Sequence, residues 1–268
     1  MVGEMEQLAP YTVQSLGSEL RALGLTSGDT VLTHSSARSL GFVAGGTQAV
    51  VQALLDVLGP SGTLVVPTHT PENTDPADWC NPPVPESWWP VIRAQAPGFD
   101  TSRTPSRWMG VIAETVRTWP GALRSDHPQV SFAALGRHAA SVTGGHQLSD
   151  ALGESSPLGV IYRLDGKVLL LGCGHDSNTS LHLAEWRQQS PPRAVTGASV
   201  RRANGASEWI SWTDVVADAD DFGQIGAAFE VAVGLSTGQV GDATARLTPQ
   251  RPLVDFATDW METHRPKV

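Results

Sequence analysis

The sequence predicts a single α/β domain in which helices flank a central mixed, largely parallel β-sheet. Residues 29–68 alternate strand, helix and strand, and residues 166–186 give a buried strand, a glycine turn and a helix. The 268-residue chain contains no repeat, no low-complexity tract and no change of composition that marks a linker. We therefore expect residues 1–268 to form one domain.

A βαβ unit begins the predicted sheet, after a first amphipathic helix. The elements are a helix at 12–23, a strand at 29–33, a helix at 45–58 and a strand at 62–68. Apolar residues at helical spacing predict the helices, and short apolar runs between glycines predict the strands. A crossover of this length makes the two strands parallel and their connection right-handed. His34 and Thr68 then lie just past the carboxyl ends of neighbouring strands.

Residues 69–107 lose this periodicity and are dense in proline, tryptophan and aspartate. An irregular segment of this length inside a compact domain is typically a functional lid or a disordered insert. The tryptophans, among them Trp79, Trp88 and Trp89, favour an ordered lid.

The rest of the chain continues the alternation of helices and strands. We expect helices at 108–119, 156–164, 222–233 and 253–260, a strand at 130–135, and a hairpin of 198–202 with 207–212. Ser156 followed by Pro157 is a typical helix start, because proline fits the first helical position. Asn204–Gly205 is a common hairpin turn because both residues tolerate positive φ.

Residues 166–186 carry the strongest chemical signal. Val168–Leu171 predicts a strand buried on both faces, and glycines 172 and 174 then turn the chain. Good N-cap residues at 176–178 predict a helix that continues to Trp186. On that helix His182 and Glu185 lie three residues apart on one face, as a general base and its orienting carboxylate would. The alternative is an ordinary hydrogen-bonded core histidine.

Composition narrows the class of protein. A net charge of −9 argues against nucleic acid or an anionic membrane as partner, because both attract clustered lysine and arginine. No apolar run approaches the ~20 residues that cross a bilayer, and the N-terminus lacks the pattern of a signal peptide. Cys80 and Cys173 form no disulfide framework and fit a reducing compartment. We therefore expect a cytoplasmic protein.

Three polar positions follow predicted strands: His34, Thr68 and the helix that carries His182. If these strands belong to one sheet, the side chains line one crevice, where open α/β sheets bind their ligands. The acidic residues near the insert and the helix caps have two interpretations, a solvated surface or a rim that binds a cation. They are Glu72, Asp75, Asp176, Asp220 and Asp221.

Three other motifs are weaker. Gly172-Cys-Gly174 begins like a dinucleotide fingerprint, but Ser177 replaces the third glycine, so we interpret it as a structural turn. Residues 234–238 match G-x-S-x-G but follow a helix rather than a strand, which indicates a helix-ending loop and not a nucleophile elbow. No metal is expected, because residues 175–185 lack the spacing of known metal-binding motifs.

Four blocks of the chain together resemble the aminoglycoside 3-N-acetyltransferases of the antibiotic acetyltransferase family. They are DTVLTHSSARS (29–39), LGPSGTLVVPT (58–68), GALRSDHPQVSFAALG (121–136) and residues 166–185. The blocks stand in the family's order and span nearly the whole chain. The resemblance implies an α/β fold distinct from GCN5-related acetyltransferases, acetyl-coenzyme A as donor, no metal, and a polycationic aminoglycoside as acceptor.

The resemblance also implies roles for individual residues. The expected catalytic residues are His182, Glu185, Thr68 and His34. The expected coenzyme A contacts are Ser35, Ser36, Arg38, Ser106 and Arg107. The insert and the region around 214–221 vary within the family, so the resemblance does not give the range of substrates. From their acidic character, the expected aminoglycoside contacts are Glu72, Asp75, Asp176, Asp214 and Asp220. The sequence leaves the oligomeric state open, with a homodimer as one alternative.

The chemistry of these residues agrees with acetyl transfer. An acidic rim favours the ammonium form of an amine, so the attacked nitrogen needs a base such as His182. The oxyanion needs a donor such as the Thr68 hydroxyl or a backbone N–H at a helix start. The pyrophosphate is expected near the helix start at Thr47 or the turn at Ser35–Ser36. Two alternatives remain: acetylation of another small cationic amine, and a protein that binds cations without turnover.

Overall fold

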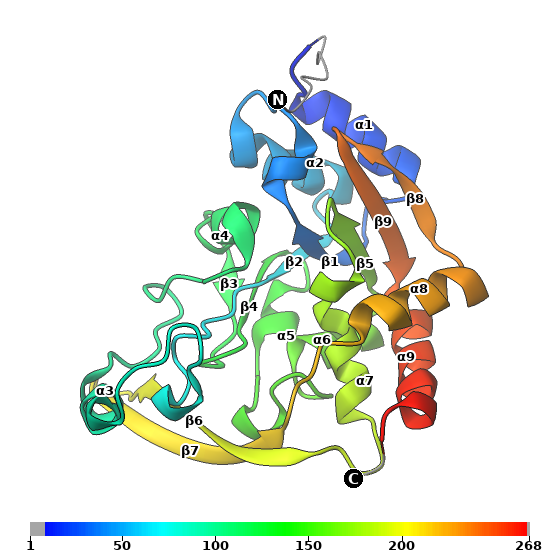
Figure 1. Cartoon of the computed structure of the whole chain (residues 1–268). Helices are drawn as coiled ribbons and strands as arrows, with labels where there is room; N and C mark the ends of the chain where they lie inside the picture. Colours follow the sequence, from blue (N-terminus) through cyan, green and yellow to red (C-terminus); the bar gives the residue numbers. More distant parts are fainter. Residues whose placement is uncertain (1–8, 267–268) are drawn as a thin grey trace, which may run out of the picture.

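Seven strands form one sheet in the order β3-β4-β2-β1-β5-β9-β8, in a computed structural model that describes residues 9–266 (Figure 1). They are β1 (Thr30–Ser35), β2 (Thr63–Pro67), β3 (Leu123–Arg124), β4 (Phe132–Gly136), β5 (Lys167–Leu171), β8 (Ser236–Val240) and β9 (Ala243–Pro249). Strands β2, β1 and β5 pair in parallel at the centre, and the outer pairs are antiparallel. The predicted mixed sheet flanked by helices is confirmed.

Helices cover both faces of this sheet. On one face lie α1 (Val13–Leu23), α2 (Gly46–Leu58) and α4 (Gly110–Arg117). On the other lie α5 (Ala139–Thr143), α6 (Pro157–Arg163), α7 (His182–Trp186), α8 (Phe222–Ala232) and α9 (Gln250–His264). Successive strand residues point to opposite faces, so Val31 packs with the first set and Leu32 with the second. This double cover explains the unbroken apolar runs of the central strands.

The predicted hairpin is confirmed and extends further than expected. Strand β6 (Arg193–Arg201) pairs antiparallel with β7 (Ser207–Val215) as a separate two-stranded sheet, and Gly205 has a φ of 84°. The interpretation of residues 234–238 as a loop is wrong from Ser236 onward, because β8 begins there and pairs with β9. No helix described between residues 9 and 266 is long and apolar enough to cross a membrane.

The predicted helix from 176–178 to Trp186 is broken in the structure. Two 3-10 turns, η5 (His175–Ser177) and η6 (Thr179–Leu181), precede the short helix α7. Asn178 interrupts the helix with a ψ of 89°, and its side-chain oxygen accepts the N–H of Ser180. Such side-chain caps compete with regular helix hydrogen bonding. As a result, His182 opens α7 instead of lying in the middle of a longer helix.

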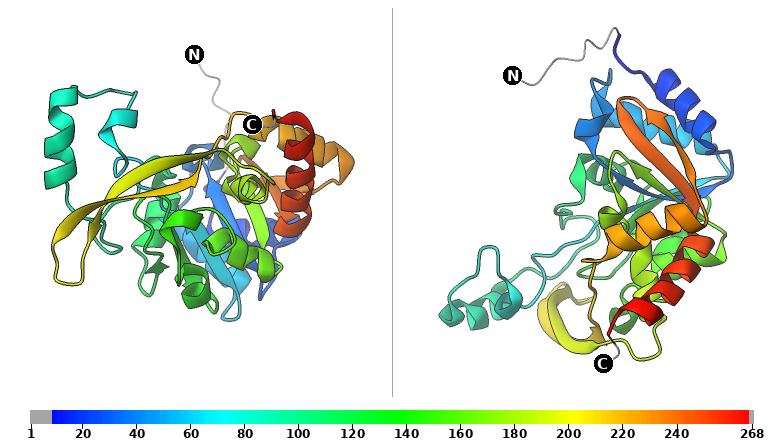
Figure 2. Two further views of the ribbon diagram at one scale, coloured as in Figure 1. Left: turned by 90° about the horizontal axis from the view of Figure 1, so that it is seen from below. Right: turned by 45° about the vertical axis from the view of Figure 1, so that its right-hand side comes forward.

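The insert at 69–107 is packed against the hairpin. It contains η2 (Pro76–Asp78), η3 (Glu86–Trp88) and α3 (Trp89–Gln95), and Figure 2 shows it beside β6 and β7 in both views. Phe99 forms a bridge with Val200. Asn73 exchanges two hydrogen bonds of 2.9 Å with the backbone of Ser199. A Cβ at Gly98 would lie 2.5 Å from the Val200 carbonyl, so the two backbones are in direct contact.

Candidate active site

A cavity of about 290 Å³ opens at the carboxyl ends of the central parallel strands. Its walls come from β1, the end of β2, the start of α4, the turns after β5 and the first residue of α8. The lining residues are Thr33, His34, Ser35, Pro67, His69, Trp108, Met109, Cys173, Asp176, Ser177, Asn178, Thr179, His182 and Phe222. This is the edge of an open α/β sheet where ligands usually bind.

His182 and Glu185 form the shortest polar contact at this cavity. The distance from His182 Nδ1 to Glu185 Oε2 is 2.6 Å, and the Glu185 side chain is only 3% exposed. The imidazole packs against the Phe222 ring with 4.7 Å between centroids. Because Nδ1 is held by the carboxylate, Nε2 is left without a hydrogen-bond partner among residues 9–266. Their predicted position on one helical face is confirmed.

The second oxygen of Glu185 is held from two sides. Arg265 Nη1 lies 2.6 Å from Oε1, and the backbone N–H of Asp218 donates to the same atom over 2.9 Å. Both oxygens of the buried carboxylate are therefore satisfied. The sequence analysis did not identify Arg265, which lies 80 residues beyond Glu185. No local spacing pattern reaches across such a separation.

Two further imidazoles face the cavity. His34, predicted as a site residue, lies within β1, and His69, which the sequence analysis did not identify, follows β2. In each ring Nε2 is buried without a partner among the residues described. Burial, together with a smaller effect of a charge on His182, lowers the pKa of His34 to about 3. Burial and the same charge hold the pKa of His69 well below its usual value, so both rings are neutral near pH 7.

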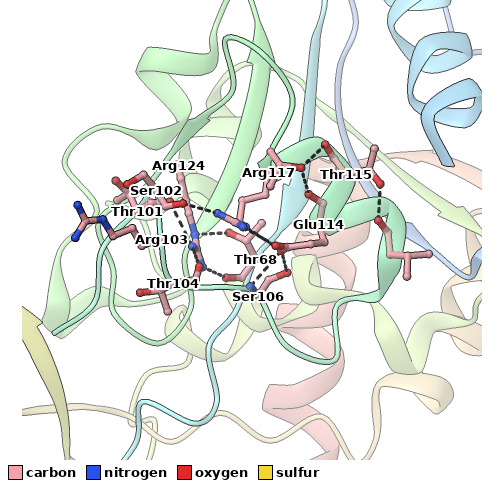
Figure 3. A network of polar contacts seen from close by, with 12 residues as sticks. Thr68, Thr101, Ser102, Arg103, Thr104, Ser106, Glu114, Thr115, Arg117 and Arg124 are labelled. Atoms are coloured by element: carbon pink, nitrogen blue, oxygen red, sulfur yellow. Dashed lines mark hydrogen bonds and ion pairs between the residues drawn. The ribbon is translucent and has the colours of Figure 1, made fainter. Parts of the chain in front are cut away.

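The Thr68 hydroxyl does not face the cavity, which corrects the prediction for this residue. Its side chain is fully buried, and Oγ1 lies 3.1 Å from Ser131 Oγ. The same Oγ1 accepts the Nε–H of Arg124 over 3.2 Å (Figure 3). Ser131 donates its own proton to the Thr68 carbonyl oxygen over 2.8 Å. The Thr68 proton is therefore directed to Ser131, and no proton is left for an oxyanion. The cavity-facing residue at this strand end is the next one, His69.

The predicted coenzyme A residues are only partly brought together. Ser35 lines the cavity, and Ser36 receives a hydrogen bond of 3.0 Å from Ser39 in the adjoining 3-10 turn η1 (Ala37–Leu40). Arg38 is exposed on that turn. Ser106 lies outside the cavity lining and donates its hydroxyl proton to Glu114 over 2.6 Å (Figure 3).

The predicted acidic rim is not assembled. Asp176 alone of the five predicted residues lines the cavity, where it is exposed. Glu72 forms an ion pair of 2.8 Å with Arg107, another predicted coenzyme A residue. Asp75 is bound by both Nε and Nη2 of Arg93.

The other two predicted acidic residues lie elsewhere. Asp214 is 5% exposed and accepts the backbone N–H of Ala151 over 3.0 Å, so it is a structural residue. Burial raises the pKa of Asp214 above its usual value. Asp220 borders a different hollow behind Glu185, lined also by Gln224 and Glu262.

The cavity offers no other obvious reactive group. Burial raises the pKa of the Cys173 thiol to about 11, so the wall of the cavity carries a neutral thiol near pH 7. No group of three His, Cys, Asp or Glu that could hold a metal ion is found among residues 9–266. Trp108 is 73% exposed at the cavity and has a φ of 62°, which is strained for a bulky residue.

A histidine–carboxylate pair at the carboxyl edge of parallel strands is typical of enzymes that use general-base catalysis. Residues 32–262 match the family model described as aminoglycoside 3-N-acetyltransferase. The SPbeta prophage-derived aminoglycoside N(3')-acetyltransferase-like protein YokD of Bacillus subtilis (strain 168) is 43% identical over 94% of this chain and 92% of that protein. Aminoglycoside N(3)-acetyltransferase IX of Micromonospora chalcea is 34% identical over 94% of each chain. The chain belongs to the aminoglycoside 3-N-acetyltransferase family.

Solved structures agree with this assignment. The crystal structure of YokD superposes with a TM-score of 0.94 at 41% identity, over 97% of this chain and 96% of that one. The binary complex of AAC-IIIb with CoASH superposes with a TM-score of 0.85 at 28% identity, over 97% of this chain and 100% of that one. The expected α/β fold of the antibiotic acetyltransferase family is therefore confirmed.

Proposed function

We propose that this protein transfers the acetyl group of acetyl-coenzyme A to the 3-amino group of aminoglycosides and so confers resistance to them. The observation that carries the proposal is the His182–Glu185 pair at the cavity, where Nε2 of His182 has no partner among residues 9–266. The fold around it is that of a family relative. Family membership over residues 32–262 supports the reaction class.

His182 acts as the general base in this proposal. An aminoglycoside amine is largely protonated near neutral pH and has no lone pair until a base removes a proton. Nε2 of His182 accepts that proton while Glu185, 2.6 Å from Nδ1, stabilises the imidazolium that forms. The neutral amine then attacks the thioester carbonyl directly and the C–S bond breaks. The second proton of the nitrogen passes to the departing thiolate, so the products are the amide and coenzyme A, without a covalent enzyme intermediate.

The oxyanion that forms on the thioester carbonyl needs a hydrogen-bond donor. His34 and His69 are neutral imidazoles at the cavity, so each carries one N–H group near pH 7. They take the place that the sequence analysis gave to the Thr68 hydroxyl. Thr68 supports this arrangement indirectly. Arg124 Nη2 donates to the Thr68 carbonyl oxygen over 2.7 Å, and this bond fixes the backbone directly before His69.

Coenzyme A is placed along the side of the cavity formed by Ser35 and the start of α4. Helix α4 begins at Gly110 without a side-chain cap, as α2 does at Gly46. Free N–H groups at helix starts favour phosphate oxygens. The exposed indole of Trp108 stands beside this path and offers a stacking surface.

The proposal is tested by release of free thiol from acetyl-coenzyme A when an aminoglycoside such as gentamicin is added. We expect His182→Ala to lower kcat by about 100-fold or more, because a positioned general base contributes about 10²–10⁴. His138→Ala is the matched control, since His138 lies at the start of α5 and outside the cavity lining. A folded wild-type protein that releases no thiol with any aminoglycoside would contradict the proposal, and product NMR locates the acetylated amine.

One observation favours a second candidate, acetylation of a smaller cationic amine. Of the five acidic residues predicted to bind substrate, only Asp176 faces the cavity. A substrate with one or two amines needs fewer carboxylates than a polycation does. A panel of mono- and diamines distinguishes the candidates: a kcat/KM well above that of every aminoglycoside would favour the second.

A further inference from the structure

We propose that Arg265, at the C-terminal end of α9, is a positioning residue that holds Glu185 in the orientation His182 needs. The proposal deepens the acetyltransferase function above and rests on it. Arg265 donates from Nη1 to Glu185 Oε1 over 2.6 Å, while Glu185 Oε2 contacts His182 Nδ1 over the same distance. One carboxylate therefore joins the arginine to the imidazole.

The guanidinium of Arg265 is itself fixed. Its Nε and Nη2 bind the two oxygens of Asp221 over 2.8 and 2.6 Å, and Nη2 also donates to the Asp218 carbonyl oxygen over 2.8 Å. A bidentate arginine–carboxylate pair has a defined plane, so the remaining Nη1 points in a defined direction. That direction is toward Glu185.

The contact joins three segments that are distant in sequence. Glu185 lies on α7, Asp218 and Asp221 lie between β7 and α8, and Arg265 is the C-cap residue of α9. Helices α7 and α9 pack side by side (Figure 1). Because Arg265 receives its position from α9, the end of the chain contributes to the geometry of the site.

The charge of Arg265 also matters to the imidazole. Burial alone would lower the pKa of Arg265, but the hydrogen bonds to Asp221 and Glu185 outweigh it and raise the pKa above its usual value. Arg265 is therefore permanently cationic beside Glu185. Loss of this charge would leave the Glu185 carboxylate free to attract the imidazolium form of His182 more strongly.

Titratable and charged groups face His182 and Glu185 from several elements. The groups that face His182 are Glu185 on α7, His34 on β1, His69 after β2, and Asp176 and Cys173 after β5. The groups around Glu185 are Arg265, Asp218 and Asp221. Of these, Arg265 is the cation in direct contact with Glu185.

The test replaces Arg265 with methionine, which keeps the unbranched apolar stem of the side chain and removes the charged guanidinium. We expect kcat to fall about 10-fold with the KM for acetyl-coenzyme A within about twofold, because orientation is lost and cofactor binding is not. We also expect the acid limb of the kcat/KM profile to move to higher pH by about 0.5–1 unit. Arg265→Lys should restore the position of the limb but only part of kcat, since one ammonium cannot hold two carboxylates.

Arg187→Met is the matched control. Arg187 is the C-cap residue of α7, and its guanidinium pairs with Glu154 and Asp255 and not with the Glu185 carboxylate. Its substitution should leave both kcat and the acid limb unchanged. Thermal melting of all three variants reports folding separately from the kinetics.

A titration of the histidine ring nitrogens by ¹⁵N NMR, without any substrate, separates this proposal from the acetyltransferase function. A His182 midpoint that moves to higher pH in Arg265→Met supports the positioning role even if no aminoglycoside is acetylated. An unchanged midpoint together with wild-type kcat would overturn it, whatever the melting temperature. If Arg265→Met does not fold, the kcat of Arg265→Lys is the test. A wild-type kcat in Arg265→Lys would overturn the proposal.

Discussion

At the scale of single residues, burial gives chemically identical side chains different properties. His34 and His69 have their pKa values lowered by burial and stay neutral, while His182 has a buried carboxylate against Nδ1. The charged form of an imidazole is favoured only where an anion or water stabilises it. Of the three cavity imidazoles, His182 is therefore the one with a carboxylate placed to stabilise an imidazolium.

The stability of the turn before His182 depends on a glycine in α8. A Cβ on Gly226 would lie 2.0 Å from Cγ of His175, a buried ring that also contacts Glu230 and Asn178. We expect Gly226→Ala to lower the free energy of unfolding by about 2–3 kcal/mol, because the ring cannot move away without losing its contacts. Urea denaturation measures this.

Gly223 is the matched control on the same helix. A Cβ there meets no atom within 4 Å. Gly223→Ala should leave the free energy of unfolding unchanged or raise it by up to about 1 kcal/mol, since alanine favours the helix. Equal destabilisation by the two substitutions would show that the contact with His175 is not the cause.

The sequence predicts some site residues and not others for a physical reason. His182 and Glu185 are three residues apart on a helix, so their contact follows from local geometry. Thr68 and His69 lie at the end of β2, where adjacent residues point in opposite directions, so an uncertainty of one residue changes which one faces the cavity. Arg265 reaches Glu185 only through the packing of α9 on α7.

At the scale of elements, short local patterns were sufficient for the central strands, the hairpin and the helices α1, α2, α4, α6, α8 and α9, but not for α3, α5 or the interrupted helix before Trp186. The antiparallel strands β8 and β9 were not predicted. Strand β8 has the sequence STGQV and is largely exposed, so it lacks an apolar pattern and depends on its pairing with β9. Such pairing is a long-range property that local propensity does not determine.

The insert and the hairpin are expected to behave as one element because of Asn73. Its side chain bonds both N–H and C=O of Ser199 and also donates to the Pro128 carbonyl over 3.2 Å. Asn73→Ala removes all three contacts and leaves the Ser199 N–H unpaired, which costs about 1–3 kcal/mol. The Ser199 carbonyl keeps the N–H of Phe99, and the Pro128 carbonyl keeps the Thr70 hydroxyl. We expect faster hydrogen exchange across 69–107 and 193–215, measured by mass spectrometry.

Asn204→Ala is the control for this experiment. Asn204 accepts one hydrogen bond from Ala206 within the hairpin turn and touches no part of the insert. Faster exchange should then be confined to the turn. Unchanged exchange of 69–107 in Asn73→Ala would mean that the remaining contacts, such as the Phe99 bridge, hold the insert without Asn73.

At the scale of the whole molecule, the sheet gathers polar side chains from distant parts of the chain. Parallel pairing of β2, β1 and β5 places their carboxyl ends at one edge, and this brings His34, His69 and His182 to one cavity. The predicted acidic residues, in contrast, are not gathered at this cavity, except for Asp176. Several acidic residues pair with arginines around the insert, as Asp75 does with Arg93 and Asp100 with Arg201, so net charge alone did not locate a substrate site.

The buried histidines make the stability of the whole fold dependent on pH. Burial lowers the pKa of His127 to about 3 and that of His146 to about 4, and His34 and His69 are lowered as well. In the unfolded chain each titrates near its usual value of about 6.5. Below that pH the unfolded state binds more protons than the folded state, so stability is lost as pH falls toward the folded-state values.

Urea unfolding at several pH values between 5 and 7 measures this dependence. Each buried neutral histidine contributes a slope of up to about 1.4 kcal/mol per pH unit, so the free energy of unfolding should fall steeply below pH 6.5. His127→Asn removes one of these histidines, so it should reduce the slope by up to about 1.4 kcal/mol per pH unit, which corresponds to one proton. Asparagine Oδ1 takes the place of the Nδ1 that accepts the N–H groups of Gln129 and Val130. An identical slope in this variant would mean that His127 is protonated in the folded state, with Nδ1 unable to accept those bonds.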